Sequence, residues 1–199
     1  MQESGTKQRI IDAALGMFAA GGYDKVTIRD IAYEAGITSG SIYGHFESKE
    51  QILWECYNFY LERRHDTRLR REEYLPIIKS GTKQEVVQAI NYTYSEEILE
   101  RMIMAMLVVF SRLYIDKRAM EVYADEINSS MEYLTGFFRA GIDLGRFYEF
   151  NVPSISLIYL STRLYTAQSV VLEPEQKSKW RQAESEMFEE LIKIIPFRY

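Results

Sequence analysis

The sequence has 199 residues, which fits one main body with a small additional domain better than two large domains. Hydrophobic residues make up 47% and charged residues 27%, so we expect the whole chain to fold rather than to stay disordered. The net charge is −5, and residues 1–50 carry five Lys and Arg against seven Asp and Glu. This balance excludes a broadly basic surface, so any binding to nucleic acid must depend on local geometry.

Cysteine content and hydropathy indicate the compartment. Cys56 is the only cysteine, so no internal disulfide can form, and residues 1–7 lack the charged and then apolar pattern of a signal peptide. The longest apolar run, Met102–Phe110, has nine residues, about half of what a membrane-spanning helix needs. We therefore expect a cytoplasmic protein that has no contact with a membrane, and we interpret this run as a buried helix.

The spacing of apolar residues predicts an all-α protein. Apolar positions recur three and four residues apart along most of the chain, and strict alternation is not sustained. Near the N-terminus one such stripe stops at Gly21 and Gly22, and glycine commonly terminates helices. This pattern predicts a first helix whose apolar face consists of Ile10, Ile11, Ala14, Leu15 and Phe18.

Two short helices are predicted next. Thr27, with Asp30 three residues later, has the pattern of a capping box and predicts a helix over 28–34. Thr38 can cap the following helix, over 39–45, which has a weak apolar face. A tight turn with a glycine lies between the two helices, and this layout is typical of a helix-turn-helix.

A longer helix is predicted to follow. Ser48, with Gln51 three residues later, again has the capping-box pattern, and apolar residues continue at helical spacing after it. We expect this helix to extend to about Glu73. The prediction for the whole chain is a three-helix helix-turn-helix domain in residues 1–50 and a larger helical-bundle domain for ligand sensing and dimerisation in residues 51–199.

About residues 6–55 resemble the N-terminal signature of the TetR family of transcriptional regulators. The resemblance is specific because residue types and spacings agree jointly, including a Tyr-x-His-Phe-x-x-Lys run, and the chain length and helical remainder agree with the family too. It implies a homodimer in which each subunit reads DNA with a helix-turn-helix. The segments that carry it are Thr27–Ala32, Ala35–Ile37, Gly40–Phe46 and Ser48–Glu50.

The resemblance also implies which side chains face the DNA. They lie at the start of the second helix, on and after the third, and at the start of the fourth. Hydroxyl groups there can donate to phosphate or base, and small residues allow a close approach to DNA. Gly44 departs from the family because relatives often carry a large side chain there, which predicts fewer base contacts. The DNA-binding candidates are Thr27, Arg29, Thr38, Ser39, Ser41, Tyr43, His45 and Lys49.

Three of these candidates have a second interpretation. Tyr43 could belong to the core and still reach a phosphate with its hydroxyl group. Lys49 could be solvated, but a cation at a helix start opposes the helix dipole, which favours a phosphate partner. His45 could bind a metal in principle, but His65 is the only other histidine and Cys56 lies on the next helix. No ligand set is visible, so we expect neither a metal nor a cofactor.

Prolines mark the last two predicted helices. Pro153 opens a helix that reaches about Leu172, and Pro174 opens one that ends at Pro196. Both carry broad apolar faces. The resemblance implies that these helices, about 153–172 and 175–195, pair with their copies in a second subunit. The alternative is that their apolar faces are buried within one chain.

The larger domain is expected to bind a small-molecule effector. Arg112 and Arg163 lie within otherwise apolar helices, where an unpaired charge is costly, so an anionic or polar ligand could neutralise one of them. The alternative is that each arginine faces solvent or meets a carboxylate such as Glu96, Glu97 or Glu132. With adaptable methionine and aromatic residues added, the ligand-binding candidates are Met106, Phe110, Arg112, Tyr114, Phe138, Tyr159 and Arg163.

These features predict a DNA-binding transcriptional regulator: a homodimeric repressor that binds a palindromic operator and is released by a small-molecule effector. The alternative is a small-molecule enzyme or binding protein that carries a helix-turn-helix head. The sequence has no glycine-rich phosphate loop, no His-Glu-x-x-His pair and no Gly-x-Ser-x-Gly motif, which argues against an enzyme.

Overall fold

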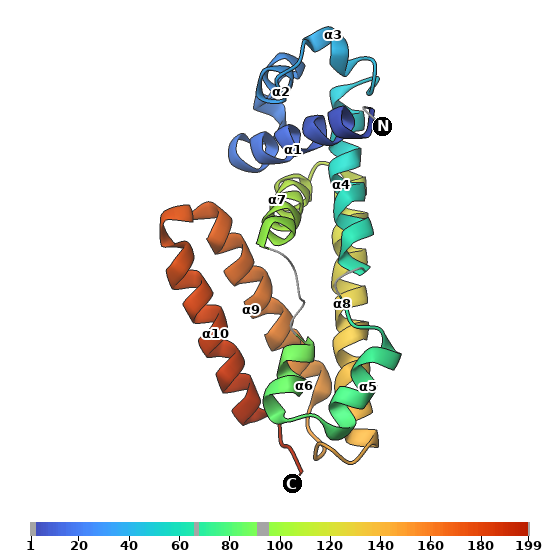
Figure 1. The fold of residues 1–199 in the computed structure, drawn as a ribbon, viewed down its shortest axis with the longest axis vertical. Coiled ribbons are helices and arrows are strands. Elements are labelled where there is room, and N and C mark those ends of the chain that lie inside the picture. Colours follow the sequence, from blue (N-terminus) through green and yellow to red (C-terminus); the bar gives the residue numbers. More distant parts are fainter. Residues whose placement is uncertain (1–2, 66–67, 91–95, 199) are drawn as a thin grey trace. The chain divides into compact units, whose positions relative to one another are not determined.

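The computed structural model describes residues 3–65, 68–90 and 96–198 (Figure 1). In these residues the regular structure is helical apart from one isolated antiparallel bridge between Phe147 and Phe197, so the all-α prediction is confirmed. The helices in chain order are α1 (Glu3–Gly21), η1 (Tyr23–Lys25), α2 (Ile28–Glu34), α3 (Ser39–Ile42), α4 (Lys49–His65), α5 (Arg71–Ser80), α6 (Lys83–Ile90), α7 (Glu96–Arg112), α8 (Lys117–Asp143), α9 (Val152–Leu172), η2 (Pro174–Gln176) and α10 (Lys177–Ile194).

The chain divides into two compact units. The first comprises Met1–Arg64 and Ser95–Ala124, and the second comprises His65–Tyr94 and Asp125–Tyr199. The functional boundary predicted at residue 50 falls inside α4 and stays a prediction.

The core of the first unit forms where α1 packs along α7 and against α2. The apolar stripe predicted for the first helix is confirmed, because each of its five members is buried. From α4 the buried residues include Ile52, Tyr57 and the lone thiol, Cys56. Burial of these groups supplies the main favourable free energy of the unit and fixes α4 against the N-terminal helices.

Local capping signals set the helices of the head, residues 1–50. Thr27 and Thr38 are the N-cap residues of α2 and α3, as the sequence predicts. Gly22 and Gly36 have φ angles of 79° and 66°, in the left-handed region that favours glycine, and they allow the chain to turn after α1 and after α2.

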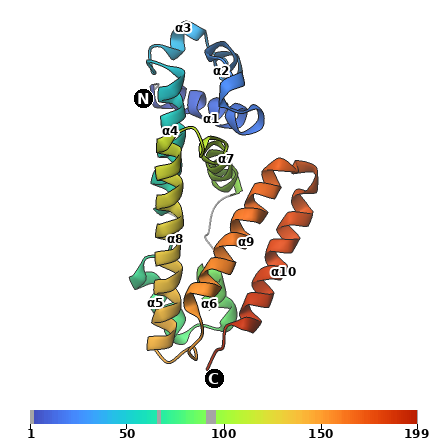
Figure 2. The ribbon, with the colours of Figure 1, turned by 180° about the vertical axis from the view of Figure 1, so that it is seen from behind.

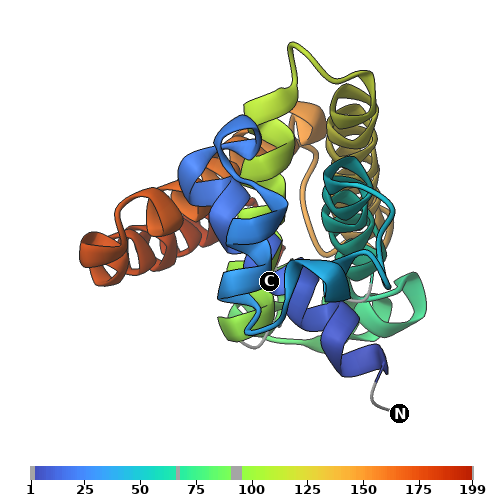
Figure 3. The same ribbon diagram turned by 90° about the horizontal axis from the view of Figure 1, so that it is seen from above.

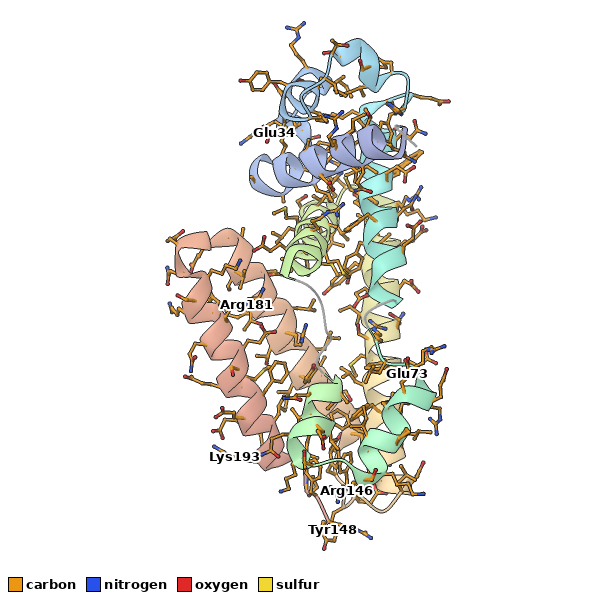
Figure 4. All side chains as sticks on the ribbon, viewed as in Figure 1. Glu34, Glu73, Arg146, Tyr148, Arg181 and Lys193 are labelled. Carbon is orange, nitrogen blue, oxygen red and sulfur yellow. The ribbon has the colours of Figure 1, made fainter. Side chains whose placement is uncertain are left out.

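The prediction that the fourth helix extends to about Glu73 is wrong. Helix α4 ends at His65, and a separate helix, α5, begins at Arg71. The carboxylate of Glu73 accepts a hydrogen bond from the backbone N–H of Arg70 at 2.7 Å, so this residue caps the start of a new helix. Figure 4 shows Glu73 at this end of α5.

The second unit is built around an aromatic core in which Phe137, Phe138 and Phe147 are fully buried. Helices α9 and α10 lie side by side, in orange and red in Figures 2 and 3, and the helix predicted from Pro153 to about Leu172 is confirmed as α9. Phe197, after α10, stacks edge-on against Phe147 with ring centroids 4.9 Å apart. The chain beyond α10 is therefore part of this core.

No helix in the described part of the chain combines the length and the apolar character that crossing a membrane requires.

Candidate nucleic-acid interface

Thr27 and Asp30 form a reciprocal cap at the start of α2. The Thr27 hydroxyl accepts from the backbone N–H of Asp30 at 3.2 Å and donates to its carboxylate at 2.7 Å. The backbone N–H of Thr27 donates to the same carboxylate at 2.9 Å. These bonds from Thr27, the hydroxyl first and the N–H second, hold the pKa of the Asp30 carboxyl below its usual value. They order the backbone of the first turn of α2, which includes Arg29.

A second cap orders the short helix α3. The Thr38 hydroxyl accepts from the backbone N–H of Ser41 at 3.2 Å, and the two side-chain hydroxyls lie 2.8 Å apart. Ile42 and Phe46 are buried beneath this segment, so apolar contacts hold it although it is only four residues long. The cap and the buried anchors together position a helix that has little apolar surface of its own.

The predicted DNA-facing residues fall into two groups by exposure. Ser39 and His45 are half-buried, whereas the Tyr43 side chain is 61% exposed. The alternative in which Tyr43 is a core residue is therefore wrong. The remaining candidates at α2 and α3 are also exposed: Thr27, Arg29, Thr38 and Ser41. Helices α2 and α3 pack on each other, so these exposed residues come from two neighbouring helices of the head.

Lys49 has partners that the sequence does not reveal. Its Nζ donates to the backbone carbonyls of Tyr23 at 2.9 Å and Val26 at 2.8 Å. It also lies over the Tyr23 ring, 4.0 Å from the centroid. Burial is the main cause that raises the pKa of the Tyr23 phenol. Lys49 therefore ties the start of α4 to η1, and the interpretation of this lysine as merely solvated is wrong.

Four of the ligand-binding candidates lie in the first unit. Met106 is buried, and Phe110 packs against Tyr123 with ring centroids 4.9 Å apart. The Arg112 guanidinium pairs with carboxylates of its own chain, whereas Tyr114 is fully exposed. Met106 and Tyr114 thus lie in opposite environments, one buried and the other exposed.

The other three candidates lie in the second unit. Phe138 is fully buried in the aromatic core. The Tyr159 hydroxyl donates to the carbonyl of Ile90 at 3.1 Å, and Arg163 lies 3.7 Å from a carboxylate oxygen of Glu184. Arg112 and Arg163 both meet carboxylates of the chain, as the alternative interpretation predicts. The carboxylates found are not the ones that the sequence suggested. Glu132 is exposed, and the side chains of Glu96 and Glu97 lie outside the described residues.

A shallow hollow of about 530 Å³ lies between α5 and α6 in the second unit. None of the seven ligand-binding candidates lines it. Its walls are formed by Pro76, Ile77, Ser80, Gly81, Glu85, Gln88 and Ala89.

The head has the features of one class of DNA-binding protein. Two short helices with side-chain N-caps are joined by a turn that contains a glycine with a positive φ angle. Apolar residues of this segment are buried, whereas hydroxyl, guanidinium and phenol groups are exposed to solvent. On an all-helical chain this arrangement defines a helix-turn-helix regulator.

Comparison with known proteins identifies the family. Residues 10–56 match the model for bacterial regulatory proteins of the tetR family. The chain is 30% identical over 164 residues to the HTH-type transcriptional repressor KstR2 of Mycobacterium tuberculosis, and the match covers 75% of this chain and 77% of that protein. This chain belongs to the TetR family of bacterial transcriptional regulators, which confirms the resemblance seen in its sequence.

Two further comparisons separate the head from the rest. The HTH-type transcriptional regulator SrpR of Pseudomonas putida is 50% identical over 48 residues, which are 24% of this chain and 22% of that protein. A bacterial regulatory protein of the tetR family from Rhodococcus RHA1 has the same fold over 98% of both chains, with a TM-score of 0.61 at 20% identity. The match to SrpR is thus higher in identity but confined to a short segment, whereas the fold is shared over nearly the whole chain.

Proposed function

We propose that this protein is a homodimeric repressor that binds a palindromic operator through residues 1–50 and is released by a small-molecule effector bound in residues 51–199. The observation that carries the proposal is the exposed face of α2 and α3 over a buried apolar base. The name of KstR2, a repressor with 30% identity, supports repression rather than activation.

The exposed side chains suit contacts with a duplex. The Arg29 guanidinium can donate to a phosphate or to the edge of a guanine, and the hydroxyls of Ser41 and Tyr43 can donate to phosphate oxygens. Lys49 has three N–H donors, of which two reach carbonyls, so one remains for a phosphate. The proposed DNA interface would be completed by four further residues at the same two helices: the half-buried Ser39 and His45, and the exposed Thr27 and Thr38. Few basic residues are available, so base and hydroxyl contacts carry much of the binding.

The proposed dimer interface is concentrated on α9. Its exposed residues follow helical spacing along one face and include several large apolar side chains, whereas the exposed residues described in α10 are polar apart from Ile194 at its end. The apolar side of α10 packs within the chain, since Trp180 stacks edge-on against Tyr165 at 5.7 Å. An exposed stripe that carries several large apolar side chains favours association with a second copy. The large apolar residues of the stripe are Leu157, Ile158, Tyr165 and Leu172.

Release by an effector requires coupling between the two sites. Typical coupling free energies of about 1–3 kcal/mol would weaken operator affinity about 5- to 150-fold. In a dimer the two heads would read half-sites separated by roughly one helical turn of DNA, or a multiple of it. A change in the separation of the heads would therefore lower affinity for the operator.

Selection of binding sequences from a random duplex pool tests this function. We expect the purified protein to enrich a palindrome, and Tyr43→Ala to bind it about tenfold more weakly, the effect of losing about 1.4 kcal/mol. Tyr114→Ala is the matched control, because it removes another exposed tyrosine of the first unit outside α2 and α3. Failure of a folded wild-type dimer to enrich any sequence over a range of salt would contradict the proposal.

A further inference from the structure

Two arginines of α7 contact the N-terminal segment of the first unit. Arg101 pairs with Asp12 of α1 and lies over the Phe59 ring, 4.5 Å from its centroid. Arg112, eleven residues later at the end of α7, pairs with Asp24 of η1 at 3.4 Å. The two sites are roughly 16 Å apart along the helix. Helix α7 is thus fastened to the head at two separate points.

The contact at Arg112 includes a shared aromatic ring. The Arg112 guanidinium lies 4.5 Å from the centroid of Tyr23, the ring that Lys49 approaches at 4.0 Å. Lys49 also holds the carbonyl of Val26, the residue just before the cap of α2. Arg112 and Lys49 therefore act on the same short segment, and this segment leads directly into the helix that carries Arg29.

On its other side Arg112 faces Asp116, in the turn before α8. The Arg112 Nε lies 3.7 Å from Asp116 Oδ2. That carboxylate accepts from the Tyr57 hydroxyl of α4 at 3.0 Å and from the backbone N–H groups of Arg118 and Ala119. Through this one guanidinium, η1 is connected to the α7–α8 turn and to α4.

The environments of the partners determine how much this contact contributes. The Asp24 side chain is 80% exposed, and an exposed ion pair alone contributes little. The Arg112 side chain is only 15% exposed and also contacts the Tyr23 ring, so its removal disturbs more than the ion pair. Loss of Arg112 should therefore loosen η1 without unfolding the unit.

We propose that Arg112 is a positioning residue for DNA reading: it holds η1, and with it the start of α2, against the α7–α8 turn. A displacement of α7 would then reach the reading helices through this contact. The proposal rests on the proposed function, because it assumes that α2 and α3 read an operator.

Operator affinity tests the proposal in the full-length protein. We expect Arg112→Gln to bind the selected duplex about fivefold more weakly than wild type, and Arg112→Lys, which keeps the cation, to recover part of the loss. Arg118→Gln is the matched control, since it removes the same charge from an arginine whose side chain contacts Asn58 and Trp54 of α4 instead. Equal effects of Arg112→Gln and Arg118→Gln, or tighter binding by Arg112→Gln, would overturn the proposal.

Hydrogen exchange of the free protein separates this inference from the proposed function. We expect the backbone amides of residues 22–34 to exchange faster in Arg112→Gln than in the wild type, and at the wild-type rate in Arg118→Gln. This result supports the positioning role whether or not the protein selects a duplex. Unchanged exchange in this segment overturns it, even if the wild type binds an operator. Thermal unfolding of each variant establishes that the comparison is made between folded proteins.

Discussion

Gly141 shows how one missing side chain shapes the second unit. A Cβ atom at this position would collide with the ring of Phe147, which is fully buried. The Gly141 carbonyl accepts from the backbone N–H groups of Arg146 at 2.8 Å and Phe147 at 3.1 Å, which folds the chain back over the end of α8. Phe147 can therefore lie directly on the helix only because residue 141 is glycine.

We expect Gly141→Ala to lower the free energy of unfolding by about 1–3 kcal/mol, as overpacking of a core does. Gly136→Ala is the control on the same helix, because its new Cβ would meet only the Tyr74 hydroxyl at 3.9 Å. This control should gain up to about 1 kcal/mol from helix propensity. Denaturant unfolding of both variants measures the difference, and equal stability would show that Phe147 moves aside without cost.

At the residue scale the sequence predicted local partners and missed remote ones. The caps Thr27 and Thr38 were predicted because their partners lie three residues away. The carbonyl partners of Lys49, and Asp24 as one partner of Arg112, come from segments 23 or more positions distant, and no spacing rule connects them. The cost of an unpaired charge did predict that the arginines have carboxylate partners, but not which ones.

At the scale of elements, three helix starts share one device. In each, a carboxylate in the first turn accepts the backbone N–H of a residue three positions earlier, at 2.7–2.9 Å. Hydrogen bonds from these earlier residues lower the pKa of each carboxyl below its usual value, 3.8 for Asp or 4.5 for Glu. The pairs are Thr27 with Asp30 in α2, Arg70 with Glu73 in α5, and Thr82 with Glu85 in α6.

These lowered pKa values make stability depend on pH. At a pH between the lowered pKa of a carboxyl in the folded chain and its usual pKa in the unfolded chain, the unfolded chain binds more protons. The stabilisation by these carboxylates is therefore present above about pH 4.5 and is lost as the pH falls through their pKa values in the folded chain. The triple variant Asp30→Asn, Glu73→Gln, Glu85→Gln should be less stable than wild type at pH 7 and should lose less stability on acidification. Unfolding measured from pH 7 to pH 3 checks this, and parallel pH profiles would contradict it.

Helix ends marked by glycine or proline were predicted well. Helix α1 ends at Gly21 and α9 starts beside Pro153, where the sequence places these boundaries, because glycine commonly terminates helices and proline suits their first turn. The separation of α4 from α5 was missed because Arg70 and Glu73 were interpreted as part of one long charged helix. A side-chain cap by Glu73 was the signal that could have revealed the break.

At the scale of the whole molecule, the exposed stripe of α9 predicts the oligomeric state. We expect Ile158→Arg to convert a wild-type dimer into a monomer, since a buried unpaired charge in an interface costs several kcal/mol. Gln182→Arg is the control, because it adds the same charge to the exposed polar face of α10. Sedimentation equilibrium measures both, and a dimer that persists in Ile158→Arg would place the interface elsewhere.

The spacing of apolar residues predicted the fold class, but it did not show which of the last two helices keeps an exposed apolar face. Helical periodicity was sufficient for an all-α protein, because it is a property of every segment. The two C-terminal helices looked alike in sequence, and only packing shows that the apolar side of α10 turns toward α9 while α9 keeps an exposed stripe. The net charge of −5 gave no sign of DNA binding, since the proposed contacts depend on a few exposed side chains.

The single thiol of the chain makes site-specific labelling straightforward. Cys56 is fully buried, and this burial raises the pKa of its thiol, so the reactive thiolate is scarce. A cysteine in place of the exposed Tyr33 on α2 would therefore be the group that a spin-label reagent reaches first. Two such labels in a dimer would report the distance between the heads, with and without DNA, while the native cysteine stays in place.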